Sequence, residues 1–220
     1  MMTTHRIPIR LIVIAALALP LIGGCATAYY DAMEKAGIHK RDILVDRVKD
    51  ARDSQVDAQQ QFKSALEQFA SVVTLKDTDL KRAYEKLNAE HEDCEKAARK
   101  VSSRIDRVEA VADALFDEWK GELDLYKRAD LRESSRKQMK ATQSRYRGML
   151  ASMHRAEKSM EPVLGTFYDN VLFLKHNLNA QAITSLKIEF SALRGKIDGL
   201  VRRMNESIES SNTFIADLRQ

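Results

Sequence analysis

Three side chains able to bind a metal or carry redox chemistry stand close together at His91, Cys94 and Glu95. On a helix, residues three and four positions apart share a face, so this imidazole, thiol and carboxylate would point the same way and begin a metal site. However, His91 and Cys94 both fall on the apolar seam of the helix, where a small cysteine packs well. No further ligand that would complete such a site is evident, so we predict no metal site.

Other patterns that perform catalysis or hold cofactors are missing from the sequence. There is no Gly-rich phosphate loop, no serine in a nucleophile elbow and no paired-carboxylate motif. The many acidic residues are interspersed with lysine and arginine, as on the solvated face of a helix. We predict that the protein is not an enzyme, has no catalytic residue and uses no cofactor.

The strongest local signal is basic and runs from Lys127 to Arg147, with eight basic residues against two acids, or +6 in 21 residues. Arg132, Arg136 and Lys140 are spaced four apart and form one stripe on a helix. In the topology predicted below, the turn at 128–130 lies near the membrane, where basic residues can hold anionic lipid headgroups at about 1 kcal/mol each. An ordinary solvated helix face is the alternative.

The N-terminus is typical of a secretory signal. Arg6 and Arg10 accompany an apolar run, Leu11–Ile22, whose 12 residues are too few for a permanent span. Two glycines then lead to Cys25, and this ending resembles the lipobox of bacterial lipoproteins. We predict a signal peptide over 1–24 and acylation of Cys25, including palmitate. An ordinary secretory signal with an incidental cysteine is the alternative.

The composition indicates a helical protein. Its 220 residues include only 8 Gly and 3 Pro, too few for the turns of a strand-rich fold. Charged residues at 31% and apolar residues at 44% exclude a disordered tail and a multi-span membrane protein.

Apolar residues recur with a period near 3.5, as the packing of long helices requires. One such seam steps by four and three through Leu44, Val48, Ala51, Gln55, Ala58, Phe62, Ala65, Phe69 and Val72. The seams predict four helices over 39–75, 79–127, 131–177 (kinked at Pro162) and 180–218. Short loops make neighbouring helices antiparallel.

The fold class that we predict is therefore all-α: an elongated antiparallel four-helix, coiled-coil-like bundle that follows an N-terminal lipoprotein signal peptide. The domain organisation is a signal peptide over 1–24, an acylated N-terminus and short tether over 25–38, and the bundle over 39–220. We expect Asp79 to cap the second helix, and Asp130 with Glu133 to form a capping box at the third. The stretch 171–174, apolar on every face, is expected to be buried by more than one neighbour.

Three segments carry a resemblance to a known family. They are residues 28–35 (AYYDAMEK) with 37–44 (GIHKRDIL), residues 115–119 (LFDEW) and residues 171–180 (VLFLKHNLNA). They resemble a bacterial lipoprotein family of unknown function, domain-of-unknown-function family 2959, from Cys25 to the C-terminus. The resemblance implies no established activity, cofactor or catalytic residue.

We predict a non-enzymatic lipoprotein that is anchored in the outer membrane, faces the periplasm and acts as a helical interaction or scaffold module of the cell envelope. The absence of Asp after Cys25 favours the outer membrane by analogy with lipoprotein sorting. The expected partners are the membrane, through acyl chains on Cys25, and an envelope protein or a second copy of the chain, but no nucleic acid. The alternative is an apolar-ligand or lipid-binding protein with a pocket between bundle helices near Met149, Met153 and Phe173.

Overall fold

The computed structural model describes residues 29–30, 33–34, 37–74 and 79–219, so Cys25 and the predicted signal peptide lie outside the described residues. The chain divides into two compact units, Met1–Ile38 and His39–Gln220. At the end of the first unit, Gly37 adopts a φ of +81°. Its N–H donates to the carbonyl of Glu34, and that of Ile38 donates to the carbonyl of Met33. This pair of bonds is a Schellman motif, which ends a helical turn.

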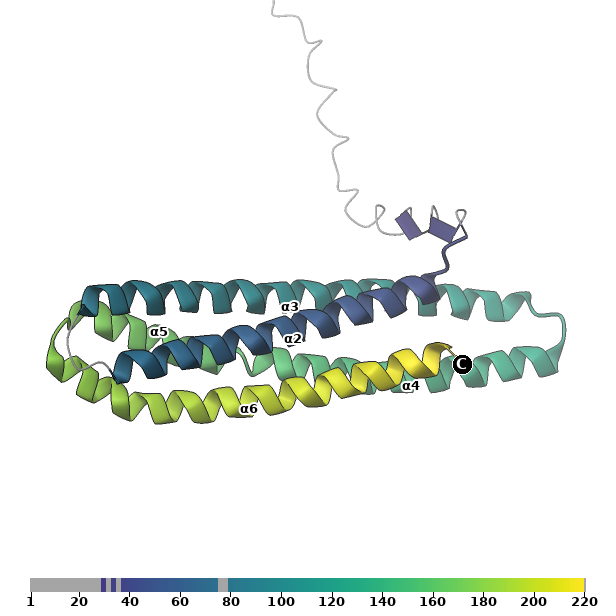
Figure 1. The fold of residues 1–220 in the computed structure, drawn as a ribbon. Helices are drawn as coiled ribbons and strands as arrows, with labels where there is room; N and C mark the ends of the chain where they lie inside the picture. The colour runs from purple at the N-terminus through teal and green to yellow at the C-terminus, as the bar shows by residue number, and fades with distance from the viewer. Residues whose placement is uncertain (1–28, 31–32, 35–36, 75–78, 220) are drawn as a thin grey trace, which may run out of the picture. The chain divides into compact units, whose positions relative to one another are not determined.

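The second unit is all-α, which confirms the predicted fold class. Its long helices are α2 (Lys40–Val73), α3 (Leu80–Glu122), α4 (Ala129–Lys158), α5 (Glu161–His176) and α6 (Ala180–Arg219), with a 3-10 turn, η1 (Leu123–Leu125), after α3 (Figure 1). No strand occurs in the part of the chain that the structure describes. Within that part, no helix combines the length and apolar character needed to cross a bilayer.

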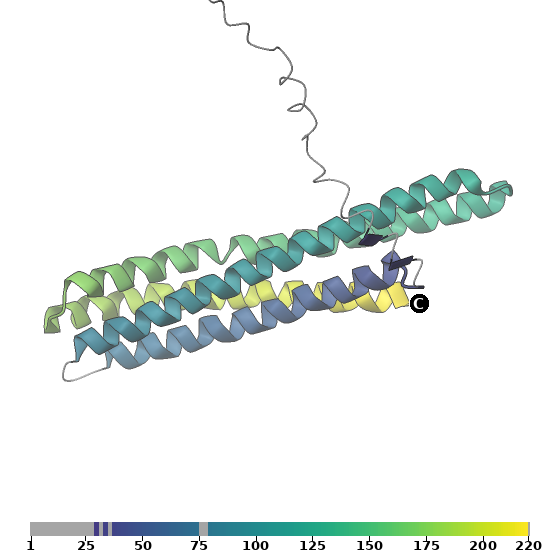
Figure 2. The same cartoon turned by 90° about the horizontal axis from the view of Figure 1, so that it is seen from above.

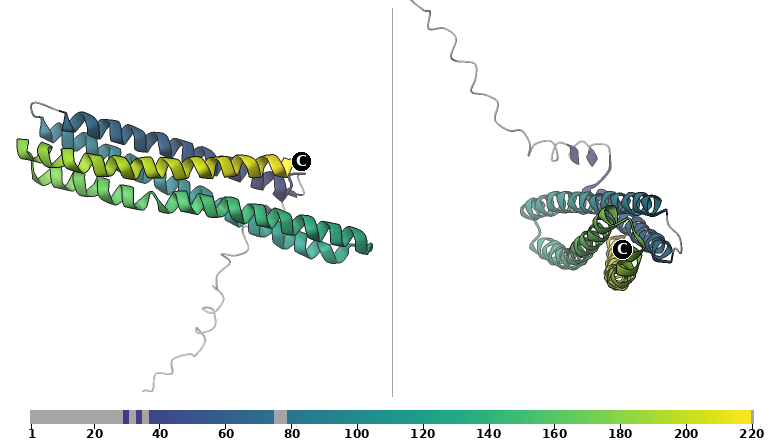
Figure 3. Two further views of the ribbon diagram at one scale, coloured as in Figure 1. Left: turned by 90° about the horizontal axis from the view of Figure 1, so that it is seen from below. Right: turned by 90° about the vertical axis from the view of Figure 1, so that its left-hand side faces the viewer.

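The helices form four antiparallel columns, because α4 and α5 follow one another along a single column (Figure 1). Helix α2 packs against α3 and α6, while α4 and α5 pack against both α3 and α6. The columns therefore close into a ring around one core, as the view along the bundle shows (Figure 3). This is the up-down-up-down arrangement expected from short loops.

The predicted apolar seams line this core. All nine seam positions of α2, from Leu44 to Val72, are buried. On α3 the same steps of four and three run from Leu80 to Tyr126. The seam positions from Leu87 to Ala112 are buried, whereas Tyr84, Leu115 and Trp119 are half-buried and Tyr126 is exposed. The seam loses its cover where α3 runs past the other helices.

Two polar side chains in the core lack hydrogen-bond partners among the residues that the structure describes. Gln55 on α2 and Ser207 on α6 are both fully buried. Neither the amide of Gln55 nor the hydroxyl of Ser207 has a partner among the described groups. Buried polar atoms normally have hydrogen-bond partners, so Gln55 lowers the stability of the folded state at its position.

The break between α4 and α5 has a local cause. Pro162 has no N–H, and in a continuous helix its ring would clash with the carbonyl of Lys158. The hydrogen bonds instead tighten for two residues: Ser159 N–H donates to the carbonyl of Ala156, and Met160 N–H to that of Glu157. Pro162 then lies in the first turn of α5, where a missing N–H costs nothing. The predicted interruption at Pro162 is confirmed.

Of two expectations about helix caps, one is confirmed and the other is wrong. The side chain of Asp79 caps α3 by accepting the Arg82 N–H at 3.1 Å, as expected. The capping box at Asp130 and Glu133 is wrong, because α4 begins earlier, with Arg128 at its N-cap and no side-chain cap bond. Asp130 already lies in the first turn, where it pairs with Arg128.

The expected burial of the whole stretch 171–174 is also wrong. Val171 and Leu174 are buried, but Leu172 and Phe173 are exposed. Residues 171 and 174 are three apart and share the inner face of α5, whereas the two between them point away from it. Among the described helices, none lies on the outer side of this column to cover them.

Helices α3 and α4 continue past the start of α2 and the end of α6 (Figure 2). The start of α2 is level with Glu118, whose carboxylate accepts from Lys40 Nζ at 2.9 Å. The end of α6 is level with Arg145, which pairs with Asp217 at 3.3 Å. We call residues 119–137, which lie beyond these contacts, the overhanging hairpin.

Candidate functional site

His91 and Cys94 lie on the inner face of α3, as the seam predicted. The His91 ring packs edge-on against Phe167 of α5, with ring centroids 5.6 Å apart, and equally close to Tyr168. The Cys94 thiol contacts the carbonyl of Gln61 on α2 at 3.8 Å. The two side chains therefore face different neighbouring helices.

The Cys94 thiol is poorly suited to nucleophilic chemistry. Burial raises its pKa to about 12, and the carboxylates of Glu90 and Asp93 add to the effect. A thiol reacts as the thiolate, so this one is almost entirely in its unreactive form near neutral pH. Glu90 beside it also has a raised pKa, because of burial and the charge of Asp93.

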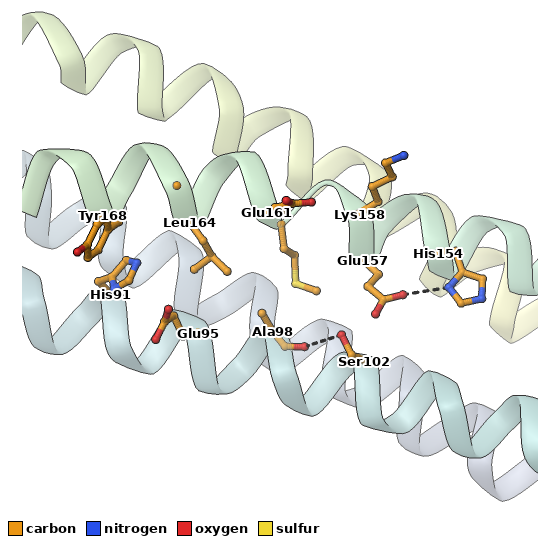
Figure 4. Close-up of a pocket in the computed structure, with 12 residues that line it drawn as sticks. His91, Glu95, Ala98, Ser102, His154, Glu157, Lys158, Glu161, Leu164 and Tyr168 are labelled. Carbon is orange, nitrogen blue, oxygen red and sulfur yellow. Dashed lines mark hydrogen bonds and ion pairs between the residues drawn. The ribbon is translucent and has the colours of Figure 1, made fainter.

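An open groove of about 780 Å³ lies between α3 and the break that joins α4 to α5. Figure 4 shows residues that line it: His91, Glu95, Ala98 and Ser102 from α3 face His154, Glu157, Leu164 and Tyr168 from α4 and α5. Its walls thus combine apolar side chains with ionisable ones.

His154 at one end of this groove is held between two carboxylates. Its Nε2 lies 2.5 Å from Glu109 of α3, and its Nδ1 lies 3.0 Å from Glu157 of α4. Burial alone lowers the pKa of His154, but the hydrogen bonds and charges of the two glutamates outweigh it and raise the pKa above its ordinary value. The imidazolium form therefore joins α3 to α4.

The polar groups of the groove do not meet at a point. The two carboxylates bind opposite nitrogens of His154, so all three cannot ligate one ion. His91 lies 18 residues before Glu109 on α3, which places it about 27 Å from His154. Among the described residues, no group of three His, Cys, Asp or Glu side chains is arranged to hold a metal ion.

A second cleft lies at the base of the overhanging hairpin, between Trp119 and the end of α6. Several of its charged groups have partners: Arg145 pairs with Asp217, and Arg41 donates to the carbonyl of Leu218. The cleft is a junction between helices rather than an array of free polar groups.

The basic stripe divides in the structure. Arg136 pairs with Glu133 at 2.5 Å, so its charge is partly neutralised. Arg132 and Lys140 have no carboxylate within 4.0 Å among the described residues, and Lys140 is exposed. The stripe lies on the overhanging hairpin and directly behind it.

The sequence reasoning missed two groups of exposed apolar residues. One is at the turn of the overhanging hairpin: Leu125, Tyr126 and Leu131. The other belongs to α5, the α5–α6 loop and the start of α6: Tyr168, Leu172, Phe173, Leu178 and Ile188. The apolar periodicity contains a signal for the first group, because Tyr126 lies on the apolar seam of α3 beyond Ala112, the last buried position of that seam.

The residues expected to line an apolar pocket are not brought together. Met149 and Met153 lie on α4 and are buried in the core of the bundle, whereas Phe173 is exposed on α5. Phe173 follows Met153 by 20 residues along the same column, a distance of about 30 Å. A pocket shared by all three is therefore ruled out.

Comparison with known proteins matches the chain to a family. A family model described as a protein of unknown function (DUF2959) covers residues 29–218. No curated protein and no solved structure matches the chain.

Proposed function

The chain belongs to DUF2959, a family of proteins of unknown function, and from this premise we propose that it is a non-enzymatic helical interaction module of the cell envelope. An acylated Cys25 anchors it in the outer membrane, and the bundle faces the periplasm. The all-helical fold is compatible with such a role.

The observation that carries this proposal is the exposed apolar surface of the α5–α6 hairpin. Tyr168, half-exposed at the edge of the groove, and Leu172 are four residues apart, so they share one face of α5. Phe173, Leu178 and Ile188 add exposed apolar side chains to the same hairpin. An amphipathic helix of another envelope protein docks through contacts of this kind, with apolar side chains three and four residues apart.

The polar groups of the bundle support a structural role for its titratable residues. His154 is committed to an interhelical bridge, His91 is packed against aromatic rings, and Cys94 is buried with a raised pKa. Each of these groups stabilises contacts between helices, and none is aimed at a shared reaction centre.

In-cell photo-cross-linking tests the partner surface. A benzophenone side chain at Leu172 should form a cross-link to an envelope protein, whereas one at Arg107, an exposed residue in the middle of α3, should not. The purified partner should then bind the bundle, and the pair Tyr168→Gln and Leu172→Gln should abolish that binding. A cross-link only to a second copy of the chain would favour self-association, and equal capture at both positions would refute the docking surface.

The lipid anchor needs a separate test. Radiolabelled palmitate should enter the wild-type chain and should not enter the Cys25→Ser variant. The full-length wild-type protein should sediment with outer membranes. Failure of the label to enter the wild type would exclude the anchor, whatever the α5–α6 hairpin binds.

The alternative function, binding of an apolar ligand, is favoured by the groove shown in Figure 4. Gly165 lines this groove, and a Cβ added there meets no atom within 4 Å. Gly165→Leu should therefore fill the groove without disturbing the fold. If native mass spectrometry finds a co-purifying lipid on the wild type that Gly165→Leu lacks, this alternative gains support over the first proposal.

A further inference from the structure

The turn of the overhanging hairpin exposes apolar side chains at the position farthest from the core. Leu125 in η1 is 78% exposed, Tyr126 after it is 39% exposed, and Leu131 in the first turn of α4 is 44% exposed. Turns at the surface are normally built from small and polar residues. Three large apolar residues within seven positions of one turn therefore indicate a surface that is covered by something else.

Charged side chains of both signs surround this turn: Glu122 and Asp124 are exposed before it, and the unpaired basic side chains follow it. Lys127 and Arg132 flank the apolar residues, and neither has a carboxylate within 4.0 Å in the described part of the chain. The nearby acid Asp130 is already paired with Arg128, and Glu133 with Arg136. From Lys127 onward, the surface thus offers basic side chains without a carboxylate partner beside its apolar side chains.

This combination matches the chemistry of an anionic bilayer surface. Leucine side chains favour the acyl region, tyrosine is enriched at headgroup level, and lysine and arginine bind anionic headgroups. The turn is also convex, since it is only two helices wide and projects beyond α2 and α6 (Figure 2). A soft interface accepts a convex projection, whereas a folded protein partner would need a matching cavity.

The length of the chain before the bundle is consistent with this placement, and here the argument rests on the proposed anchor at Cys25. Fifteen residues separate Cys25 from Lys40, so the connection spans at most about 54 Å. The turn lies seven residues beyond Glu118, which is level with Lys40, and so extends about 12 Å past the start of α2. The turn is therefore within reach of the membrane that holds the anchor.

We propose that the turn of the overhanging hairpin docks into the surface of an anionic phospholipid bilayer. The side chains of Leu125 and Leu131 enter the boundary between headgroups and acyl chains, and Tyr126 lies at headgroup level. Lys127 and Arg132 bind lipid phosphates, and Lys140 follows behind them on the stripe. This contact fixes one end of the bundle on the membrane and directs the α5–α6 hairpin away from it.

Vesicle binding without the anchor tests this contact by itself. Residues 39–220 form a compact unit with its own core, so they are prepared without the preceding segment. They should bind vesicles of phosphatidylglycerol and phosphatidylethanolamine and bind vesicles of phosphatidylcholine more weakly. The pair Leu125→Gln and Leu131→Gln should lower the partition coefficient by about tenfold, since the burial of two leucine side chains is lost.

A matched control is available at Ile188, which is 72% exposed on α6 and far from the turn. Ile188→Gln should leave the partition coefficient unchanged. The pair Lys127→Gln and Arg132→Gln should remove the preference for phosphatidylglycerol. Circular dichroism melting of each variant verifies that the bundle is folded.

A fluorescent reporter locates the contact. Trp119 is the single tryptophan of the chain, and Tyr126→Trp adds a second indole at the turn. Brominated acyl chains should quench the added indole more strongly than Trp119. Wild-type binding that is absent, unaffected by the leucine pair or without quenching at position 126 would overturn the proposal. Because this test needs no acyl chain on Cys25, its result is independent of palmitate labelling and of the partner at α5.

Discussion

The indole Nε1 of Trp119 donates a 2.9 Å hydrogen bond to the hydroxyl of Ser135, and this bond joins the two helices of the overhanging hairpin. Beyond the ends of α2 and α6, the two helices of the hairpin are the described helices of the bundle that can bury its side chains. Ser135 is nevertheless buried, and Trp119 is half-buried beside it. The pair therefore closes the hairpin where the four-column core ends.

Trp119→Phe tests this closure, because it keeps an aromatic ring and removes the donor. We expect a loss of about 1 kcal/mol in the free energy of unfolding of the hairpin. Hydrogen exchange of backbone amides in residues 119–137 should accelerate, while exchange in the middle of α2 should not change. Ser135→Ala should have the same effect, and the double variant should lose no more than either single one. Additive losses would show that the bond does not couple the helices.

Gln55 should limit the stability of the core. Its amide is fully buried and unpartnered among the described groups, so Gln55→Leu should raise the free energy of unfolding by about 1–2 kcal/mol. Gln59→Leu is the matched control, because the amide of Gln59 donates to Asn205 at 2.7 Å and gains nothing from replacement. Urea denaturation measures both. Destabilisation by Gln55→Leu would mean that the amide is hydrogen-bonded to water in the core.

Lys40 and Glu118 should respond unequally to mutation. Lys40 Nζ lies 2.9 Å from Glu118 Oε1, and the lysine side chain is 5% exposed whereas that of the glutamate is 30% exposed. Glu118→Ala takes one carboxylate away from an almost fully buried ammonium group and should cost about 1–2 kcal/mol in unfolding free energy. Lys40→Met leaves a carboxylate that water can reach and should cost less. Equal costs in urea denaturation would contradict this asymmetry.

The bridge at His154 should make stability depend on pH. The folded-state pKa is raised above the ordinary value of 6.5, so the bridge is fully formed below that value and is lost as pH rises through the folded pKa. His154→Gln should therefore destabilise the protein below pH 6.5 by on the order of 0.5 kcal/mol, a small effect because the site is solvated. The difference from wild type should shrink at higher pH. A difference that grows with pH would refute the bridge.

Cys94 should be protected from thiol reagents in the folded state. With a pKa of about 12, its thiolate fraction at pH 8 is on the order of 10⁻⁴. In a Cys25→Ser background, Ellman's reagent should react with Cys94 only at the rate of unfolding, and urea should make the reaction fast. Rapid labelling of the folded protein would show that α2 and α3 open at Gln61.

The periodicity of the sequence was sufficient to predict the core. The position of a residue along the helix decides whether it faces the core, whatever its type. Gln55 occupies a seam position of α2, and it is therefore buried in the core although it is polar. The positions of the loops followed from the same signal, because an antiparallel bundle leaves few ways to connect the seams. The break at Pro162 followed from the missing N–H of proline.

Exposure at the ends of the bundle could not be predicted in the same way. A seam shows which face of a helix is apolar, but burial also requires a neighbour at that level. Tyr126 continues the seam of α3 after α2 is no longer beside it, and so it is exposed. Leu172 and Phe173 lie on the outer side of α5, where no additional helix covers them. The partners of Arg136 and His154 depend on side-chain geometry across helices, which the periodicity does not specify.

The break at Ser159 and Met160 has a mechanical consequence. The column consists of two separate helices joined end to end, α4 with 30 residues and α5 with 16, rather than one continuous helix. A pull applied to α5 is relieved at this joint, because the regular hydrogen-bond ladder is interrupted there. Load taken up at one end of the bundle therefore bends the column in the middle before it reaches the opposite end.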